Sequence, residues 1–325
     1  MPATSRVSLQ ASSSNPMESD IDAATLAALI RLVRQHTGIA MTDKKRILLQ
    51  GRLRPRIRTL GLAGYDAYLA HLLSEISEIP TFVNLVTTND TAFFRTPHVW
   101  DYFCNQFLPA WYVEHAGKTL QVWSAAAASG EEAYSIAMVC EQFLQQHPDF
   151  SYEIFGTDIS TEALEAARVG RYTGRSVERL AASHPHLKKI YFTEHGTTLE
   201  VLPLLRRHVR FAEHNLLAPL LQHAPYLVPQ QTAQQTPKPA QFDIVFLRNV
   251  LIYLDDVNQQ CVVEQVCKSM RPNARLVLGE SETLGRLNIA HRYEMPMVYG
   301  FAPASEDTAP DKIAHAFEEI DHATF

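Results

Sequence analysis

The segment from Val122 to Ala137 constrains the fold of this 325-residue chain more than any other stretch. It is typical of a short apolar strand, a loop of small residues and a helix whose first turn carries Glu131 and Glu132. Such a loop lets a ligand approach the bare backbone N–H groups at the helix start. It holds one glycine and several alanines instead of a Gly-x-Gly-x-x-Gly turn, so a cofactor without phosphates fits better than a pyrophosphate dinucleotide.

Apolar segments alternate with helical patterns after Arg95, which predicts a mostly parallel sheet covered on both faces. The predicted strands are 120–123, 153–156, 209–212, 242–247, 274–278 and a last pair near 293–301; the predicted helices include 131–146, 160–169 and 256–270. Turn signals indicate a small insert within 172–210, and the composition of residues 222–241 indicates a flexible surface loop.

The N-terminal part shows helical periodicity without β-alternation. Leu26, Ile30 and Val33 recur at helical spacing, and Gly38 ends that helix. Further helices are expected around 47–57, at 65–76 and at 80–86. We therefore predict a small all-α domain over residues 21–86 and an α/β domain over 87–303, between a disordered N-terminus (1–20) and a C-terminal tail (304–325).

Composition excludes several classes of protein. The net charge of −6 argues against a nucleic-acid-binding protein. The sequence has no apolar run of about 18 residues for a membrane span, and the Ser-rich first residues lack the apolar core of a signal peptide. Cys104, Cys140, Cys261 and Cys267 show no CxxC or framework spacing, which predicts buried, reduced thiols in a cytoplasmic protein. No residues have metal-ligand spacing, so no metal is expected.

Two polar residues follow predicted strands. Asp158 ends the strand that begins at residue 153, where a carboxylate of a Rossmann-like sheet accepts hydrogen bonds from a ribose. The alternative is a helix N-cap, although Ser160 could fill that role alone. Asn249 follows the strand at 242–247 and would share a helix face with Tyr253 if a helix began there; a buried structural asparagine is the alternative.

Two further features each allow two interpretations. Glu131 either complements the helix macrodipole or accepts a hydrogen bond from the ammonium of a methionine-like group. The segment from Thr87 to Arg95 either lines a pocket between the domains or is a capped helix start with Phe93 and Phe94 in the core.

A run of cations marks the predicted helix around residues 47–57, where seven cations occur in fifteen residues without an acid: Lys44, Lys45, Arg46, Arg52, Arg54, Arg56 and Arg58. Solvated helix faces usually mix signs, so this run favours docking of an anionic partner. Because the rest of the chain is acidic, an acidic protein is favoured over nucleic acid as the partner. The alternative interpretation is an ordinary solvated helix face. Pro55 should kink or split the helix.

Five motifs together resemble the chemoreceptor glutamate methyltransferases, the CheR family, over roughly residues 22–303. They are Thr88 to Arg95, Trp123 to Glu132, Thr157 to Ser160, Arg248 to Tyr253 and Gly279 to Glu282. The resemblance implies a Rossmann-like class I methyltransferase domain with a small inserted β-subdomain within 172–210, preceded by a small all-α domain. The chain departs from the family pattern at Ala133, where proline is usual, and at Ala127 and Ala128, where Cys, Ser or Thr is common.

The resemblance also implies S-adenosylmethionine as cofactor and methyl-ester formation on glutamates of a chemoreceptor's cytoplasmic coiled coil. The residues it places around the cofactor are Asn89, Thr91, Arg95, Glu131, Asp158, Asn215, Leu216, Asn249 and Val250. A glutamate side chain is already ionised at neutral pH, so no general base is required. We expect Arg95 and Tyr253 to steer this carboxylate, the cation run to face the acidic receptor helices, and the protein to be monomeric and not inserted in a membrane.

Two alternatives stay open: a class I methyltransferase acting on another protein carboxylate or a small molecule, and a non-enzymatic relative that signals by docking alone. The segment from His195 to Glu200 is shorter than in relatives whose β-subdomain holds a tethering pentapeptide at the receptor's end. We therefore expect no dependence on such a tether.

Overall fold

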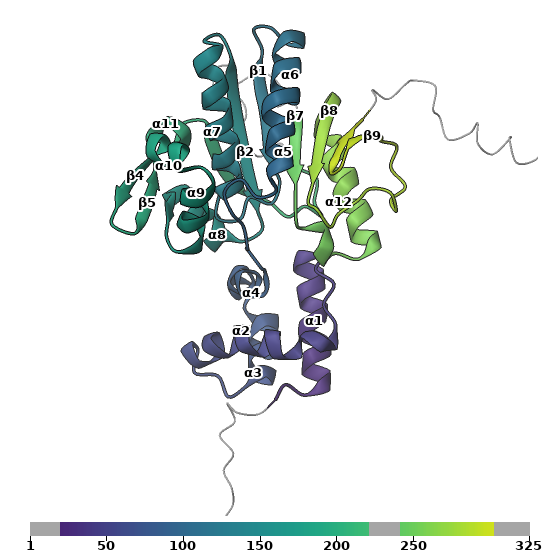
Figure 1. Cartoon of the computed structure of the whole chain (residues 1–325). Coiled ribbons are helices and arrows are strands. Elements are labelled where there is room, and N and C mark those ends of the chain that lie inside the picture. The colour runs from purple at the N-terminus through teal and green to yellow at the C-terminus, as the bar shows by residue number, and fades with distance from the viewer. Residues whose placement is uncertain (1–19, 221–240, 302–325) are drawn as a thin grey trace, which may run out of the picture. The chain divides into compact units, whose positions relative to one another are not determined.

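The structure is a computed structural model that describes residues 20–220 and 241–301 (Figure 1). The predicted C-terminal tail (304–325) lies outside the described residues, as do all but the last residue of the predicted disordered N-terminus (1–20) and of the predicted loop (222–241). The described residues form two compact units, one within Met1–Thr88 and one within Asn89–Phe325.

Residues 20–88 form four short α-helices around an apolar core. They are α1 (Ala23–Thr37), α2 (Arg46–Thr59), α3 (Tyr65–Ser74) and α4 (Ile79–Val86), with 3₁₀ turns η2 (Asp43–Lys45) and η3 (Ile76–Glu78). Asp22 caps α1 at its start, and Gly38 ends it with a φ of 75° that favours glycine. The largest fully buried side chains here include Leu29, Tyr68 and Phe82.

Helix α2 runs unbroken through Pro55, so the predicted split is wrong. Leu49, Leu53 and Ile57 lie on one face of the helix and are almost completely buried in the core of this unit. Burial contributes about 1.5–3 kcal/mol for each such side chain. Together these exceed the cost of about 3 kcal/mol for a proline inside a helix, so packing keeps the helix whole.

The larger unit is built on a seven-stranded sheet of order β6-β2-β1-β7-β8-β10-β9. The strands are β1 (Thr119–Ser124), β2 (Ser151–Asp158), β6 (Val209–Glu213), β7 (Phe242–Leu247), β8 (Met270–Leu278), β9 (Arg292–Met295) and β10 (Val298–Gly300). The first five in this order pair in parallel, while β10 is antiparallel to β8 and β9. The alternation of apolar segments and helices therefore predicted the sheet correctly.

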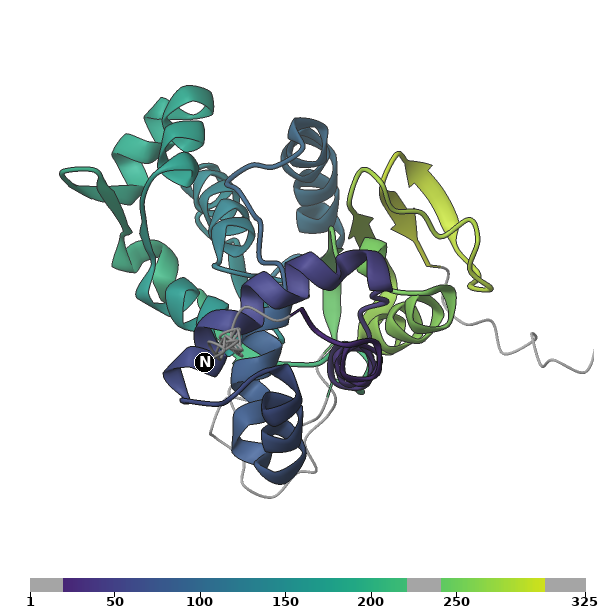
Figure 2. The ribbon, with the colours of Figure 1, turned by 90° about the horizontal axis from the view of Figure 1, so that it is seen from below.

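Helices cover both faces of this sheet (Figures 1 and 2). One face carries α5 (Pro97–Tyr102), the π-helical turn η4 (Phe103–Phe107), α6 (Leu108–Glu114) and α7 (Glu131–Gln146); the other carries α12 (Asp256–Lys268). Strand β7 shows the two-residue period that results. Ile244 and Phe246 join the core of the first face, whereas Val245 and Leu247 join the core of the second.

A second, antiparallel sheet of order β3-β5-β4 lies in the insert. Its strands are β3 (Arg171–Tyr172), β4 (Phe192–His195) and β5 (Thr198–Val201), with α9 (Arg175–Ser183) and α10 (Pro185–Tyr191) between the first two; α8 (Thr161–Val169) precedes the sheet and α11 (Pro203–Arg206) follows it. Phe93 packs edge-on against Tyr172 and Phe192, which joins the insert to the core. The predicted fold class is confirmed.

One composition-based prediction is wrong in part. The four cysteines are free thiols, but only Cys140 is buried; Cys104 is exposed, and Cys261 and Cys267 are half-buried. Cys104 lies in η4, and the other two lie in α12 beside its buried face. Among the described residues, no helix combines the length and the apolar character that crossing a bilayer requires, and no cluster of three or more His, Cys, Asp or Glu side chains could hold a metal ion.

A buried carboxylate stabilises the helical unit. Glu78, 5% exposed, accepts two hydrogen bonds from Arg56 (2.9 and 2.6 Å) and one from the Tyr68 hydroxyl (3.1 Å). The hydrogen bond from Arg56, above all, lowers the pKa of Glu78 below its ordinary 4.5. A lowered folded-state pKa means that the stabilisation is present above the unfolded-state pKa and is lost as pH falls through the folded-state value.

We predict that Glu78→Gln lowers the unfolding free energy by about 1–3 kcal/mol at neutral pH, because it leaves the Arg56 guanidinium without its anionic partner. The difference from the wild type should shrink as pH falls through the lowered pKa. Urea unfolding over a pH series measures this, with the exposed Glu75→Gln as control. A difference that stays the same at every pH would contradict the prediction.

Candidate functional site

The predicted cofactor residues gather where β1, β2 and β7 end. Strands β2 and β6 lie on one side of β1, whereas β7 and β8 lie on its other side. The strand order therefore reverses between β1 and β7. Open α/β sheets bind ligands outside the carboxyl ends of their strands at such a switch point. The loops that follow these three strands therefore define the candidate site.

Asp158 closes the end of β2 and is 8% exposed. One carboxylate oxygen accepts from the backbone N–H of Ala128 (2.8 Å) and the other from that of Ser160 (2.9 Å). Burial is the main cause that raises the pKa of Asp158, and these hydrogen bonds act against it. Ser160 caps α8 by accepting from Ala163 N–H, as predicted, so Asp158 is not needed as the cap.

Glu131, the first residue of α7, is also buried (4% exposed). Its two oxygens accept from the hydroxyls of Ser176 (2.9 Å) and Ser129 (2.7 Å). Burial raises the pKa of Glu131, and both hydroxyl contacts lower it. An ionised carboxylate offers about four acceptor positions, so Glu131 retains capacity for a cationic donor.

A buried ion pair lies next to Glu131. Arg248, at the end of β7, contacts Glu132 at 3.0 Å, and their side chains are 2% and 10% exposed. Glu132 also accepts from Ser124 Oγ at the end of β1 (2.8 Å). Burial raises the pKa of Glu132, and the Arg248 charge opposes this. Nε of Arg248 is buried without a hydrogen-bond partner among the described residues.

The loop that carries Arg95 is held by the same arginine. The carbonyl of Arg95 accepts from Arg248 Nη2 and from Trp100 Nε1, both at 2.9 Å. Phe94 and Thr96, on either side, have φ values of 51° and 67°, which L residues with side chains rarely adopt. Such strain costs about 1–3 kcal/mol per residue and persists where surrounding bonds impose it. The backbone at Arg95 is thus firmly placed.

The start of this loop contacts β2's end. Asn89 Nδ2 donates to Ser160 Oγ (3.1 Å), and Thr91 is half-buried between Asn89 and Arg95. Asn215 and Leu216 follow β6 next to the same strand end, since the N–H of His214 donates to the carbonyl of Asp158 (2.9 Å). These candidates therefore lie around the ends of neighbouring strands.

Asn249 is fixed by Glu282. This carboxylate, 7% exposed, accepts from the backbone N–H groups of Gly279 (2.6 Å), Asn249 (2.8 Å) and Leu251 (2.7 Å). Asn249 has a φ of 61°, and the 3₁₀ turn η5 (Leu251–Tyr253) follows. No α-helix begins at Asn249, so the condition under which Asn249 and Tyr253 would share a helix face is not met. Val250 is half-buried, and Tyr253 is 37% exposed.

The cations of α2 and η2 differ in their surroundings. Arg56 pairs with Glu78, Arg52 donates to the end of α4 at Thr87 O (2.9 Å), and Arg54 contacts the Tyr65 hydroxyl (3.4 Å). Arg52 and Arg56 therefore stabilise the helical unit itself, and Arg46 is half-buried. The exposed members, which stay candidates for docking, are Lys44, Lys45 and Arg58.

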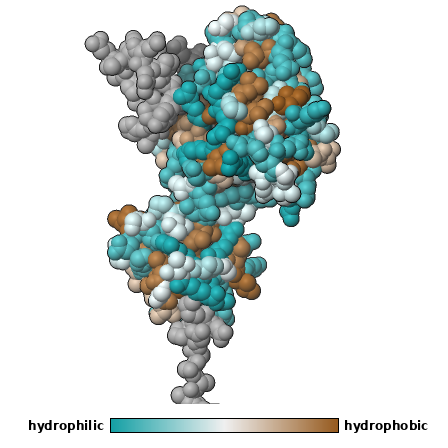
Figure 3. All heavy atoms as spheres, turned by 90° about the vertical axis from the view of Figure 1, so that its left-hand side faces the viewer, coloured by the Kyte–Doolittle hydropathy of each residue, from teal (hydrophilic) through white to brown (hydrophobic). Residues whose placement is uncertain are grey.

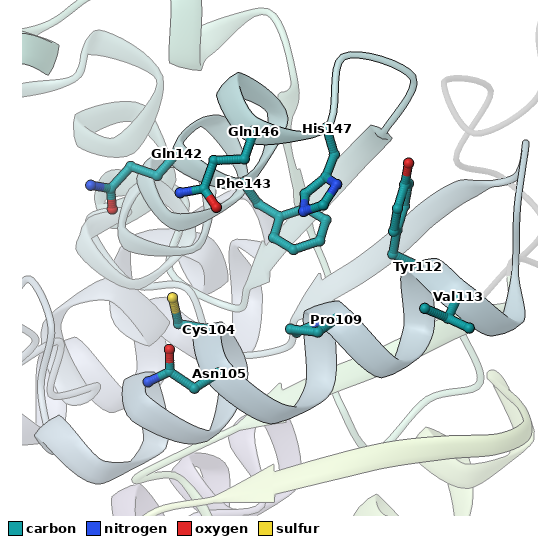
Figure 4. Close-up of a pocket in the computed structure, with 9 residues that line it drawn as sticks. All are labelled: Cys104, Asn105, Pro109, Tyr112, Val113, Gln142, Phe143, Gln146 and His147. Carbon is teal, nitrogen blue, oxygen red and sulfur yellow. The ribbon is translucent and has the colours of Figure 1, made fainter.

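A hollow between α6 and α7 does not belong to this site. Figure 4 shows its lining, which includes Cys104, Tyr112, Gln142 and His147. It lies near the C-terminal end of α7, whereas Glu131 begins that helix. A 16-residue helix is about 24 Å long, so the hollow is far from the strand ends.

Four residues of the site have no role that the sequence alone predicts: Glu132, Arg248, Glu282 and Ser176. A charged residue next to a buried apolar strand is a usable signal, because such a charge is rarely buried without a partner. Arg248 directly follows the strand at 242–247 and carries that signal. Its partner could not be identified, since Glu132 is 116 positions away.

The parallel sheet, the loop after β1 that lacks the glycine pattern of dinucleotide-binding proteins, and the acid that ends β2 all fit the cofactor-binding domain of an S-adenosylmethionine-dependent methyltransferase. The chain belongs to the CheR methyltransferase family: residues 89–226 and 229–297 match the CheR SAM-binding domain, and residues 24–87 match the CheR all-alpha domain. It is therefore an S-adenosylmethionine-dependent methyltransferase of chemotaxis.

Curated relatives agree with this assignment. The chain is 35% identical to the chemotaxis protein methyltransferase of Escherichia coli (strain K12) over 263 residues, which cover 79% of this chain and 83% of the relative. It is 33% identical to that of Salmonella typhimurium over 268 residues (80% and 83%). It is 34% identical to chemotaxis protein methyltransferase 2 of Pseudomonas aeruginosa over 251 residues (76% and 81%).

We predict that Gly279→Ala weakens binding of S-adenosylhomocysteine at least about tenfold, the equivalent of 1.4 kcal/mol. A Cβ there would lie 2.7 Å from both Asn249 Nδ2 and Glu282 Oε2, so the asparagine must move. Isothermal titration calorimetry measures the affinity. The control is Gly285→Ala in the same loop, where a Cβ meets only Thr283 Oγ1 at 3.5 Å. Unchanged affinity in a folded Gly279→Ala variant would remove Asn249 from the cofactor site.

Proposed function

We propose that the protein transfers the methyl group of S-adenosylmethionine to glutamate side chains on a chemoreceptor's cytoplasmic helices. The observation that carries the proposal is the fixed backbone at Arg95, whose guanidinium donates to the Asp90 carbonyl (3.1 Å) and whose charge acts to lower the pKa of the buried Glu132. A guanidinium is suited to orient an anionic acceptor. The relatives' name, chemotaxis protein methyltransferase, supports a protein of chemotaxis as the acceptor.

The residues fit the cofactor. Asp158 would accept from the ribose hydroxyls, and Glu131 from the ammonium, because both carboxylates are buried and have acceptor capacity beyond their present donors. The remaining contacts would come from Asn89, Thr91, Arg95, Asn215, Leu216, Asn249 and Val250. When bound, the cofactor supplies a methyl group activated by its sulfonium.

The chain's own task is alignment. A glutamate acceptor is ionised at neutral pH, so no residue has to remove a proton. Arg95 would orient the carboxylate, and Tyr253, partly exposed beyond Asn249, would shape the passage to the methyl group. Holding two reactants in line can supply about 7–11 kcal/mol of the barrier reduction, which suits a site whose loops are fixed by buried hydrogen bonds.

Substrate binding would also use the helical unit. Lys44, Lys45 and Arg58 are exposed and would face acidic receptor helices. The β4–β5 hairpin turns through Gly196 between two four-residue strands. We keep the expectation that no tethering pentapeptide is required, and that the enzyme acts as a monomer in the cytoplasm; fusing the pentapeptide to a receptor should not tighten binding.

Cofactor binding should weaken as pH falls. Asp158 and Glu131 must be ionised to accept these hydrogen bonds, and burial raises the pKa of both. As pH falls through the raised pKa values, the two carboxyl groups become protonated in the free protein and no longer accept these hydrogen bonds. The affinity for the cofactor should therefore begin to fall at a higher pH than it would for carboxylates with ordinary pKa values. Calorimetric titration with S-adenosylhomocysteine over a pH series tests this. Asp158→Asn should bind more weakly and flatten the profile; a wild-type profile independent of pH would contradict the prediction.

Methyl transfer from radiolabelled S-adenosylmethionine to receptor cytoplasmic fragments tests the function. We predict base-labile label on the receptor, its loss when the acceptor glutamates are changed to glutamine, and a drop in kcat of about 10²-fold or more for Arg95→Met. Label on a different protein or on a small molecule would support the alternative substrates. Cofactor binding without any labelling would support a docking protein.

A further inference from the structure

The insert differs in charge from the rest of the chain. Residues 168–210 contain nine cations and three acids, although the whole chain has a net charge of −6. The cations are Arg168, Arg171, Arg175, Arg179, Lys188, Lys189, Arg206, Arg207 and Arg210. The acids are Glu178, Glu194 and Glu200.

Six of these cations have partners within the unit. Arg171, Lys188, Arg207 and Arg210 each contact a glutamate, and Arg168 and Arg206 donate to backbone carbonyls. Within the part of the chain that the structure describes, the side chains of Arg175, Arg179 and Lys189 form no ion pair or hydrogen bond, and all three are exposed. The fold therefore leaves a particular subset of the insert's positive charge to solvent.

Two of the three lie on one face of α9. Arg175 and Arg179 are four residues apart, while Leu180 on the other face is fully buried in the core. Glu178 is the acid that shares their exposed face. Lys189 belongs to the following helix, α10. The surface of the insert, which faces the viewer in the upper part of Figure 3, is mostly hydrophilic with scattered apolar residues.

Helix stability does not explain this placement. Arg175 is the first residue of α9, where a cation opposes the helix macrodipole, and no side chain caps this end. The next residue, Ser176, donates to Glu131 in the candidate cofactor site (2.9 Å). Arg175, whose side chain is exposed, is therefore adjacent in sequence to a residue whose side chain contacts the candidate site.

We propose that Arg175 and Arg179, with Lys189, form a recognition surface at the rim of the cofactor crevice for carboxylates that flank the acceptor glutamate on the substrate helix. Residues four apart on a helix are about 6 Å apart along its axis. Two arginines at this spacing match two acidic side chains three or four positions apart on a facing helix. This surface belongs to the cofactor-binding unit, so it would set the acceptor's position relative to the methyl group. The proposal rests on the proposed function.

The test is a double charge reversal, Arg175→Glu with Arg179→Glu. The matched control is Lys118→Glu with Lys268→Glu, which makes the same change in net charge. Both control lysines are exposed, and they lie near the amino-terminal ends of strands, whereas the candidate site lies at the carboxyl ends: Lys118 precedes β1, and Lys268 ends α12 shortly before β8. Initial rates with a receptor cytoplasmic fragment give kcat and KM, and calorimetry gives the affinity for S-adenosylhomocysteine.

We expect the α9 variant to raise KM for the receptor fragment about tenfold at low ionic strength, with kcat within about twofold of the wild type. The difference should narrow at high ionic strength, because exposed charges are screened. Affinity for S-adenosylhomocysteine should not change. Arg175→Lys with Arg179→Lys should keep a KM near that of the wild type, since the charge is retained.

The proposal would be overturned if the α9 variant and the control had the same KM. If both stayed at the wild-type value, the arginines would have no role, and if both rose equally, net charge alone would explain the effect. These outcomes leave the proposed function standing, since the wild type still methylates the receptor. If the wild type does not methylate receptor glutamates at all, both the proposed function and this surface fail.

Discussion

The buried pair of Glu132 and Arg248 is the interaction on which the site depends. It joins the end of β1, the first turn of α7 and the end of β7, and through the Arg95 carbonyl it also holds the loop before α5. A buried ion pair adds little net stability relative to apolar packing, but removing one partner costs about 3–5 kcal/mol. We infer that its value here is geometric, because it imposes a strained backbone on either side of Arg95.

Asp158 and Glu282 also hold loops of the candidate site in place through hydrogen bonds. Asp158 fastens the loop after β1 to the end of β2, and Glu282 collects three backbone N–H groups around Asn249. Loops without regular secondary structure need such partners for their backbone donors. A carboxylate that accepts from two or three N–H groups thus supplies the hydrogen bonds that a neighbouring strand would otherwise provide. These hydrogen bonds hold the loops in place, which suits the proposed methyl transfer to an ionised carboxylate, because that reaction needs alignment more than acid–base chemistry.

The sequence predicted the elements that a local apolar period marks. Each strand of the large sheet coincides with an apolar segment of the sequence, and the ends of two of these segments located Asp158 and Asn249. The helices at 97–114 were not predicted, because the π-helical turn at 103–107 interrupts the apolar spacing between them. The left-handed backbone at Asn249 was also missed, since it depends on Glu282, 33 positions away. Contacts at such separations leave no period in the sequence.

For the same reason, charge density along the chain did not predict which of the cations in a run are exposed. The run at 44–58 is the densest in the sequence, yet Arg56 is neutralised by Glu78 and Arg52 is bound to the end of α4. The insert shows no comparable run, yet it leaves two arginines exposed on α9, next to Ser176, which contacts the candidate cofactor residue Glu131. An acidic substrate meets only the charges that folding leaves without partners. The density of cations in a sequence therefore indicates where to look, and the internal pairing decides which of them can bind.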